Sequence, residues 1–258
     1  MIPLRDNIPT RRFPVLTVAL IAINVFVFVF LQHGGHFGLG APNNNNLVRW
    51  GLIPYEVTHP GKECVLVAGG QIGCGSAKAA ERASGQSQPN TWLTMITSIF
   101  MHGGLLHIAG NMLFLWIFGN NIEDSMARWR FVLFYLLGGI VANFAQIAVG
   151  PNSTAPGIGA SGAIAAVLGG YALLYPRARV ITAVILIFFI TLLDLPALLV
   201  LGGWFVLQLL DAAVNSPLGG GVAYFAHIGG FLFGLLLIKL FADRVNTDYQ
   251  RVNRLPVY

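Results

Sequence analysis

Charged residues are scarce in this chain. Asp, Glu, Lys and Arg together make up 10% of the 258 residues, whereas hydrophobic residues make up 55%. A soluble globular domain carries about 25% charged residues, and the mean hydropathy of this chain is +0.70. The shortage of charge excludes an ordinary soluble domain and predicts an integral membrane protein.

Several recognition patterns are also missing. The net charge is +5, yet no cluster of Lys and Arg with interleaved aromatic residues occurs. The sequence has no internal repeat in register and no glycine pattern of a dinucleotide site or a P-loop. These absences argue against nucleic acid as a partner and favour an interpretation of the basic residues as topology signals.

Six apolar runs approach or reach the ~20 residues that cross a bilayer core of ~30 Å. The first exceeds the apolar core of a secretory signal peptide, and no clear small-residue cleavage site follows it. We therefore predict an all-α membrane domain of six transmembrane helices. The runs are residues 13–31, 105–119, 131–149, 158–175, 195–214 and 222–242.

Basic residues gather on one side of this arrangement when the runs are counted alternately. By the positive-inside rule, both termini are expected in the cytoplasm. The expected organisation is a cytoplasmic segment 1–12, a membrane domain 13–242 and a cytoplasmic tail 243–258, in a bacterial inner membrane. The basic residues are Arg5, Arg11, Arg12, Arg128, Arg130, Arg177, Arg179, Lys239, Arg244, Arg251 and Arg254.

Two segments lie between the predicted spans. Residues 180–193 give only 14 apolar positions, so we expect them along the cytoplasmic interface or as a bent extension of the fifth helix. Residues 33–90 form a long polar loop, expected outside the membrane. This loop contains Cys64 and Cys74, and an oxidising compartment would permit, without requiring, a disulfide between them.

Polar side chains within the apolar runs are the candidates for chemistry, because polar groups in hydrocarbon are costly and usually face the bundle interior. His107 and Asn111 are four residues apart and share one face of a helix, either as packing partners or as functional groups. His102 lies where the preceding loop enters that helix. No carboxylate or thiolate stands at ligand spacing from these histidines, so no metal site is predicted.

Ser161 stands at the start of the fourth run, between Gly159 and Gly162. The glycines permit a tight turn that leaves the hydroxyl uncovered, and the start of a helix presents free N–H groups. Such a place can stabilise an oxyanion. A serine that simply caps the helix is the alternative.

His227 stands near the start of the sixth run, and Gly230 and Gly234 follow it on the same helix face. The fourth run carries a similar strip of small residues, and small residues let two helices approach closely. If the two strips touch, Ser161 and His227 come within hydrogen-bond reach. A serine beside a histidine is an activated nucleophile with its general base.

Four stretches together resemble the rhomboid family of intramembrane serine proteases, and they occur in the family's order. They are HGGLLHIAGN (102–111), FGNNIED (118–124), GASGAIAAVLGGY (159–171) and AHIGGFLFG (226–234). The resemblance implies a six-helix bundle without a cofactor. It also implies cleavage of the transmembrane segments of single-span or other membrane proteins, near the outer face of the bilayer.

The resemblance also implies roles for individual residues. Ser161 would be the nucleophile and His227 its base, a dyad without the carboxylate of a triad. The side chains of His107 and Asn111, with the backbone N–H of Ser161, would form the oxyanion hole. His102, Gly159 and Gly162 would help to position these groups without themselves taking part in the reaction.

One departure bears on the base. Some relatives have a tyrosine under the histidine ring, four residues after the serine, and here that position is Ala165. Support for His227 must therefore come from elsewhere.

Two other functions compete with proteolysis: a catalytically silent relative that binds or escorts helices, and a transporter or channel. The sequence shows neither an intramembrane carboxylate relay nor an inverted repeat, which disfavours transport.

Overall fold

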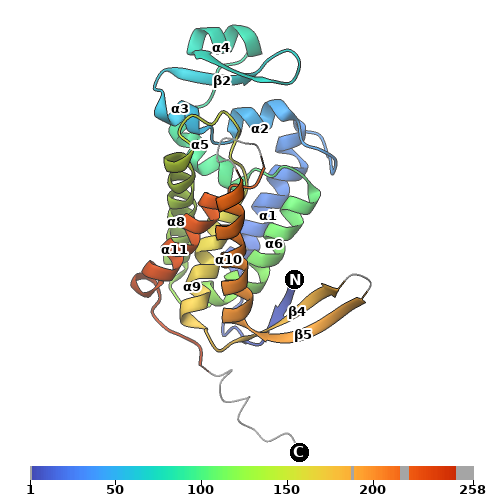
Figure 1. Cartoon of the computed structure of the whole chain (residues 1–258), viewed down its shortest axis with the longest axis vertical. Coiled ribbons are helices and arrows are strands. Elements are labelled where there is room, and N and C mark those ends of the chain that lie inside the picture. Colours follow the sequence, from blue (N-terminus) through green and yellow to red (C-terminus); the bar gives the residue numbers. More distant parts are fainter. Residues whose placement is uncertain (1, 187–188, 216–220, 248–258) are drawn as a thin grey trace, which may run out of the picture.

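The computed structural model describes residues 2–186, 189–215 and 221–247, and helices dominate this part of the chain (Figure 1). Within it, five helical stretches have the length and apolar composition of membrane spans. They are Val15–His33, Leu105–Asp124, Arg128–Val149, Ala197–Val214 and Tyr224–Phe241. The first consists of α1 (Val15–Val29) and the turn η1 (Leu31–His33), and the second of α6 (Leu105–Phe114), η3 (Leu115–Gly119) and α7 (Asn120–Asp124). The others are α8 (Arg128–Val149), α10 (Ala197–Val214) and α11 (Tyr224–Phe241).

Helix α9 (Ser161–Leu174) lies at the centre of the bundle. It has 14 residues, and every residue from Gly162 to Ala172 is buried. Its length is roughly 21 Å at 1.5 Å per residue, which is less than the ~30 Å hydrocarbon core. Helix length and composition therefore support five spans in the described residues, where the sequence predicts six.

Helices α9 and α11 meet backbone to backbone through glycine. A Cβ at Gly230 would lie 2.1 Å from the carbonyl oxygen of Gly162, and one at Gly234 would lie 1.8 Å from that of Ala166. A Cβ at Gly169 would lie 2.0 Å from the carbonyl oxygen of Phe231. The two strips of small residues do touch, as the sequence predicts, and no side chain larger than hydrogen fits at these three positions.

The expectation of an all-α fold is wrong for the described residues 180–186 and 189–193. This segment forms most of an antiparallel hairpin of β4 (Arg179–Leu186) and β5 (Phe189–Pro196), and β1 (Ile2–Asp6) pairs with β4 to complete a three-stranded sheet. The sheet lies across one end of the bundle (Figure 1). Burial alternates at the start of β4, since Val180 and Thr182 are fully buried whereas Ile181 between them is 40% exposed. The β-branched residues and the two-residue period are typical of a strand.

Asp6 fixes this sheet beneath α9. The Asp6 carboxylate accepts hydrogen bonds from the Tyr171 hydroxyl (2.7 Å) and from the Asn121 side-chain amide (2.5 Å). Burial raises the pKa of Asp6 from 3.8 to about 6, although the hydrogen bond from Tyr171 opposes the shift. The far end of the helix that begins at Ser161 is thus attached to the first strand of the chain.

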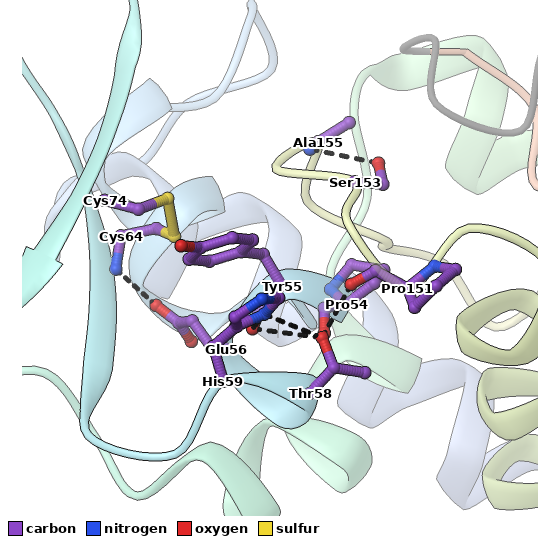
Figure 2. The surroundings of a disulfide bond; sticks show 10 residues. All are labelled: Pro54, Tyr55, Glu56, Thr58, His59, Cys64, Cys74, Pro151, Ser153 and Ala155. Carbon is purple, nitrogen blue, oxygen red and sulfur yellow. Dashed lines mark hydrogen bonds between the residues drawn. A yellow bond between two sulfur atoms is a disulfide. The ribbon is translucent and has the colours of Figure 1, made fainter.

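The segment between α1 and α6 is folded. It contains α2 (Asn44–Trp50), α3 (Pro54–Thr58), the hairpin of β2 (Lys62–Leu66) and β3 (Ile72–Ser76), α4 (Ala77–Ser84), α5 (Thr91–Thr97) and the turn η2 (Ser98–Phe100). Cys64 and Cys74 face each other across the hairpin and form a disulfide (Figure 2). Glu56 accepts the backbone N–H of Cys64 at 2.6 Å, and burial raises the pKa of Glu56 to about 7.

This folded segment also braces the approach to α9. Thr58 donates to the carbonyl of Pro151 at 2.7 Å (Figure 2), and the N–H of Tyr55 donates to the carbonyl of Ser153 at 3.0 Å. Leu52 and Gly157 exchange two backbone hydrogen bonds of 2.9 and 2.7 Å. Several backbone polar groups of the segment that leads to Ser161 are therefore paired with protein.

We predict that Gly234→Ala destabilises the bundle by about 1–3 kcal/mol, the usual cost of overpacking a core. The added methyl group would meet the Ala166 carbonyl at 1.8 Å. The matched control is Gly203→Ala on α10, where nothing lies within 4 Å of the new Cβ. Thermal unfolding in detergent should show a lower Tm for Gly234→Ala alone, and equal values for both variants would contradict the glycine contact.

We also predict that Asp6 makes stability depend on pH. Because its folded pKa is raised from 3.8 to about 6, its contribution is complete below about pH 4 and is lost as pH rises through about 6, a change of about 3 kcal/mol. Asp6→Asn should remove this part of the dependence. Tm values at pH 5 and pH 7 check it, since the wild type should lose more stability over that interval than Asp6→Asn does.

Candidate active site

Ser161 is the first residue of α9, and Gly159, two residues earlier, sets its position. Gly159 has a φ of 126°, a region that favours glycine, and its N–H donates to the carbonyl of Ser98 at 2.9 Å. A Cβ at Gly159 would lie 2.9 Å from His107 Nε2 and 3.5 Å from Ser161 Oγ. Glycine is therefore needed here for both its backbone conformation and the space beside the serine.

Ser161 and His227 form a hydrogen-bonded pair. The distance from Ser161 Oγ to His227 Nε2 is 2.8 Å. His227 lies in the first turn of α11 and is 9% exposed. The proximity expected from the small-residue strips is therefore observed, and it follows from the close contact of α9 with α11.

The other nitrogen of the His227 ring contacts a residue that the sequence analysis did not place in the site. Gln208 Oε1 lies 2.7 Å from His227 Nδ1, and Gln208 is 8% exposed on α10. Trp204, one turn earlier on α10, places its ring 5.7 Å from the His227 ring. The available signal was an amide in an apolar helix, four residues after a tryptophan, but nothing in the sequence pairs α10 with His227.

His107 and Asn111 lie on α6 near the serine. Gly103 N–H donates to His107 Nδ1 at 3.3 Å. A neutral imidazole that accepts at Nδ1 carries its proton on Nε2, so His107 presents an N–H on the side of Gly159. The side-chain amide nitrogen of Asn111 is buried and has no hydrogen-bond partner in the described part of the chain.

Two further candidates from the sequence, His102 and Gly162, lie close to the residues described above. His102 is fully buried, and its ring lies edge-on to that of His107 with centroids 5.2 Å apart. The side chain of Gln32 holds the His102 backbone through hydrogen bonds of 2.7 and 2.9 Å. Gly162 packs α9 against α8, since a Cβ there would lie 2.6 Å from that of Ala142. His102 thus contacts His107, whereas Gly162 serves helix packing.

Two cavities flank Ser161. One has a volume of about 350 Å³, and the polar residues Asn143, Gln146 and Ser153 are among those that line it. The other, of about 860 Å³, lies between α6 and α10, and His107, Asn111, Ser161, Trp204 and His227 line it. Ser161 and His107 therefore line both cavities, and Asn111 lines the larger one.

The arrangement joins a serine, a histidine within proton-transfer distance and nearby donors, which are the parts of a nucleophilic site. Among the described residues, His, Cys, Asp and Glu side chains form no group of three placed to hold a metal ion. The fold and the site together define a helical membrane protein with a part-buried serine–histidine pair.

The chain belongs to the rhomboid family. Residues 89–244 match the model of the rhomboid domain. The chain is 32% identical over 162 residues to the rhomboid protease GluP of Bacillus subtilis, in an alignment that covers 63% of this chain and 24% of GluP. It is 32% identical over 152 residues to the mitochondrial presenilin-associated rhomboid-like protein of Mus musculus, covering 56% of this chain and 37% of that protein.

A third relative is the mitochondrial rhomboid protein 1 of Saccharomyces cerevisiae, 29% identical over 171 residues that cover 62% of this chain and 44% of the relative. The chain thus spans less than half of the length of these relatives.

The family and the apolar helices make this an integral membrane protein. Because the relatives include mitochondrial proteins, the comparisons do not support the expected bacterial inner membrane.

We predict that Gly159→Ala destabilises the start of α9 by about 1–3 kcal/mol, because alanine at a φ of 126° is strained and its methyl group meets His107 Nε2 at 2.9 Å. Gly157→Ala is the control, since its Cβ would make an ordinary contact of 3.4 Å with the Leu52 carbonyl. Tm values in detergent should fall for Gly159→Ala and change little for Gly157→Ala. An unchanged Tm in Gly159→Ala would contradict the strained turn.

Proposed function

We propose that the chain is an intramembrane serine endopeptidase that cleaves transmembrane segments of membrane-protein substrates. The observation that carries the proposal is the 2.8 Å hydrogen bond between Ser161 Oγ and His227 Nε2, in a site that opens to a cavity. Rhomboid membership supports it, and so does the name of GluP, a rhomboid protease. No observation favours a silent helix-binding function over this one.

The proposed chemistry begins at Ser161. His227 Nε2 takes the hydroxyl proton while Oγ attacks the carbonyl carbon of the substrate. The intermediate collapses, the C–N bond breaks, and the leaving amine takes the proton from His227. Water, activated in turn by His227, then hydrolyses the acyl-enzyme and frees Ser161.

The oxyanion would meet three donors. These are His107 Nε2–H, the Asn111 side-chain amide and the backbone N–H of Ser161. The Ser161 N–H belongs to the first turn of α9, where N–H groups have no intrahelical acceptor. The unpartnered buried amide of Asn111 supports this role, because a buried donor without an acceptor is costly unless a ligand uses it.

We place the site within the membrane near the outer face. In this topology α9 is the fourth of six crossings, residues 1–12 and 243–258 are cytoplasmic, and residues 13–242 form the membrane domain with the 33–90 segment outside. With the Leu174 end of α9 at the cytoplasmic face, Ser161 lies about 9 Å below the outer edge of a ~30 Å core. A substrate helix would enter from the bilayer and unwind near small residues to expose a peptide bond.

The test is cleavage in liposomes. We expect the purified wild-type protein to cleave members of a panel of single-span substrates, and Ser161→Ala and His227→Ala to abolish cleavage. Asn111→Ala should lower kcat about 10²–10³-fold, the usual cost of one oxyanion donor. Ser76→Ala, on an exposed residue of the β2–β3 hairpin, is the control and should keep full activity.

Two results would contradict the proposal. Cleavage that persists in Ser161→Ala would remove the nucleophile assignment. Substrates that bind the folded wild-type protein but are never cleaved would instead support the catalytically silent function.

A further inference from the structure

Both nitrogens of the His227 ring are engaged, and they contact different helices. Nε2 lies 2.8 Å from Ser161 Oγ on α9, and Nδ1 lies 2.7 Å from Gln208 Oε1 on α10. We propose that Gln208 is a positioning residue that holds His227 in the tautomer able to accept the Ser161 proton. This inference rests on the proposed protease function, whose base is His227.

The tautomer follows from hydrogen-bond chemistry. An amide oxygen only accepts, so the Nδ1 that faces Gln208 Oε1 must carry the imidazole proton. In neutral histidine the opposite nitrogen, Nε2, then has the lone pair. That lone pair faces the Ser161 hydroxyl at 2.8 Å, which is the arrangement a general base requires.

Loss of the Gln208 acceptor would make the other tautomer accessible. With the proton on Nε2, His227 would donate to Ser161 Oγ and could not take its proton. In triads a carboxylate orients the histidine at the same nitrogen and fixes the same tautomer. Gln208 would supply the orientation without a negative charge in the membrane interior, where a charged side chain is expensive.

The packing explains why this support comes from α10. Ala165, four residues after Ser161, is fully buried where α11 crosses α9, and a Cβ at Gly230 would lie 3.2 Å from that of Ala165. A large side chain at Ala165 has no room under His227. On the side of α10, Trp204 and Gln208 are four residues apart and thus share a helix face, and both contact the ring.

The position of Gln208 on α10 also argues against a packing role. The buried residues of α10 include Leu201, Gln208 and Ala212, which form one bundle-facing strip. An apolar residue would fill the position of Gln208 at less cost, because a polar group in hydrocarbon must be hydrogen-bonded. The described contact that uses its amide oxygen is the one with His227.

The first test compares kinetics of three variants of the full chain in liposomes. Gln208→Met keeps the length of the side chain and removes the acceptor, and we expect kcat to fall about tenfold with little change in KM, the scale of one lost hydrogen bond. Gln208→Glu keeps an acceptor for Nδ1–H and should retain most of the activity. Leu209→Met, at the adjacent exposed position of α10, is the control for a methionine in this helix.

The second test reads the tautomer itself and does not depend on proteolysis. The protein labelled with ¹⁵N-histidine is examined by NMR, and His227→Gln identifies the His227 signals. We expect protonated Nδ1 and unprotonated Nε2 in the wild type, and a shift toward the Nε2-protonated form in Gln208→Met. Tm measurements confirm that each variant is folded.

The outcomes separate the two proposals. An unchanged tautomer in Gln208→Met overturns the role of Gln208, whatever happens to activity. So does a folded Gln208→Glu that is as impaired as Gln208→Met. If the tautomer shifts as expected but the wild type cleaves no substrate, the positioning role stands and the proposed protease function fails.

Discussion

The close contact of α9 with α11 is the constraint on which the rest of the structure depends. Gly230 and Gly234 lie against the carbonyl oxygens of Gly162 and Ala166, so the two backbones touch. Lipid supplies little hydrophobic driving force between helices, and close packing of small residues is the main way in which they associate. At the Ser161 end of this contact the approach of the backbones leaves Ser161 and His227 one hydrogen bond apart.

Each end of α9 is held by parts of the chain distant in sequence. At its start, residues 151–157 pair with Leu52 and with α3. Tyr55 of α3 packs against the apolar cluster that contains Cys64 of the disulfide-linked hairpin. At its other end, Tyr171 donates to Asp6 in β1. Non-helical backbone within a membrane is tolerated only where protein or water satisfies it, and the backbone hydrogen bonds of Ser153 and Gly157 supply protein partners before Ser161.

The parts of the site that the sequence predicts are those encoded by local spacing. Glycine at i+3 and i+7 from His227 predicts a close helix contact, and His107 with Asn111 at i+4 predicts a shared face. The apolar runs predict the long helices to within a few residues. The roles of these residues in catalysis remain proposals.

The missed features depend on tertiary contacts. Residues 180–193 are mostly apolar and show no clear strand pattern in the sequence, and β4 pairs with β1, some 180 residues away in sequence. Gln208 lies 19 residues before His227, and an isolated amide in a helix does not reveal which neighbour it meets. The family resemblance, through Ala165, predicts that support for His227 comes from elsewhere, and the structure places Trp204 and Gln208 beside the ring.

The most direct measurement of the central claim is covalent labelling of the membrane-embedded protein with a fluorophosphonate, followed by peptide mass spectrometry. Attack by a serine Oγ on phosphorus expels fluoride, so an adduct marks an activated serine. We predict a single adduct on Ser161 that is lost in His227→Ala, because His227 must take the proton. An adduct on another serine, or labelling of Ser161 at the same rate without His227, would contradict the account.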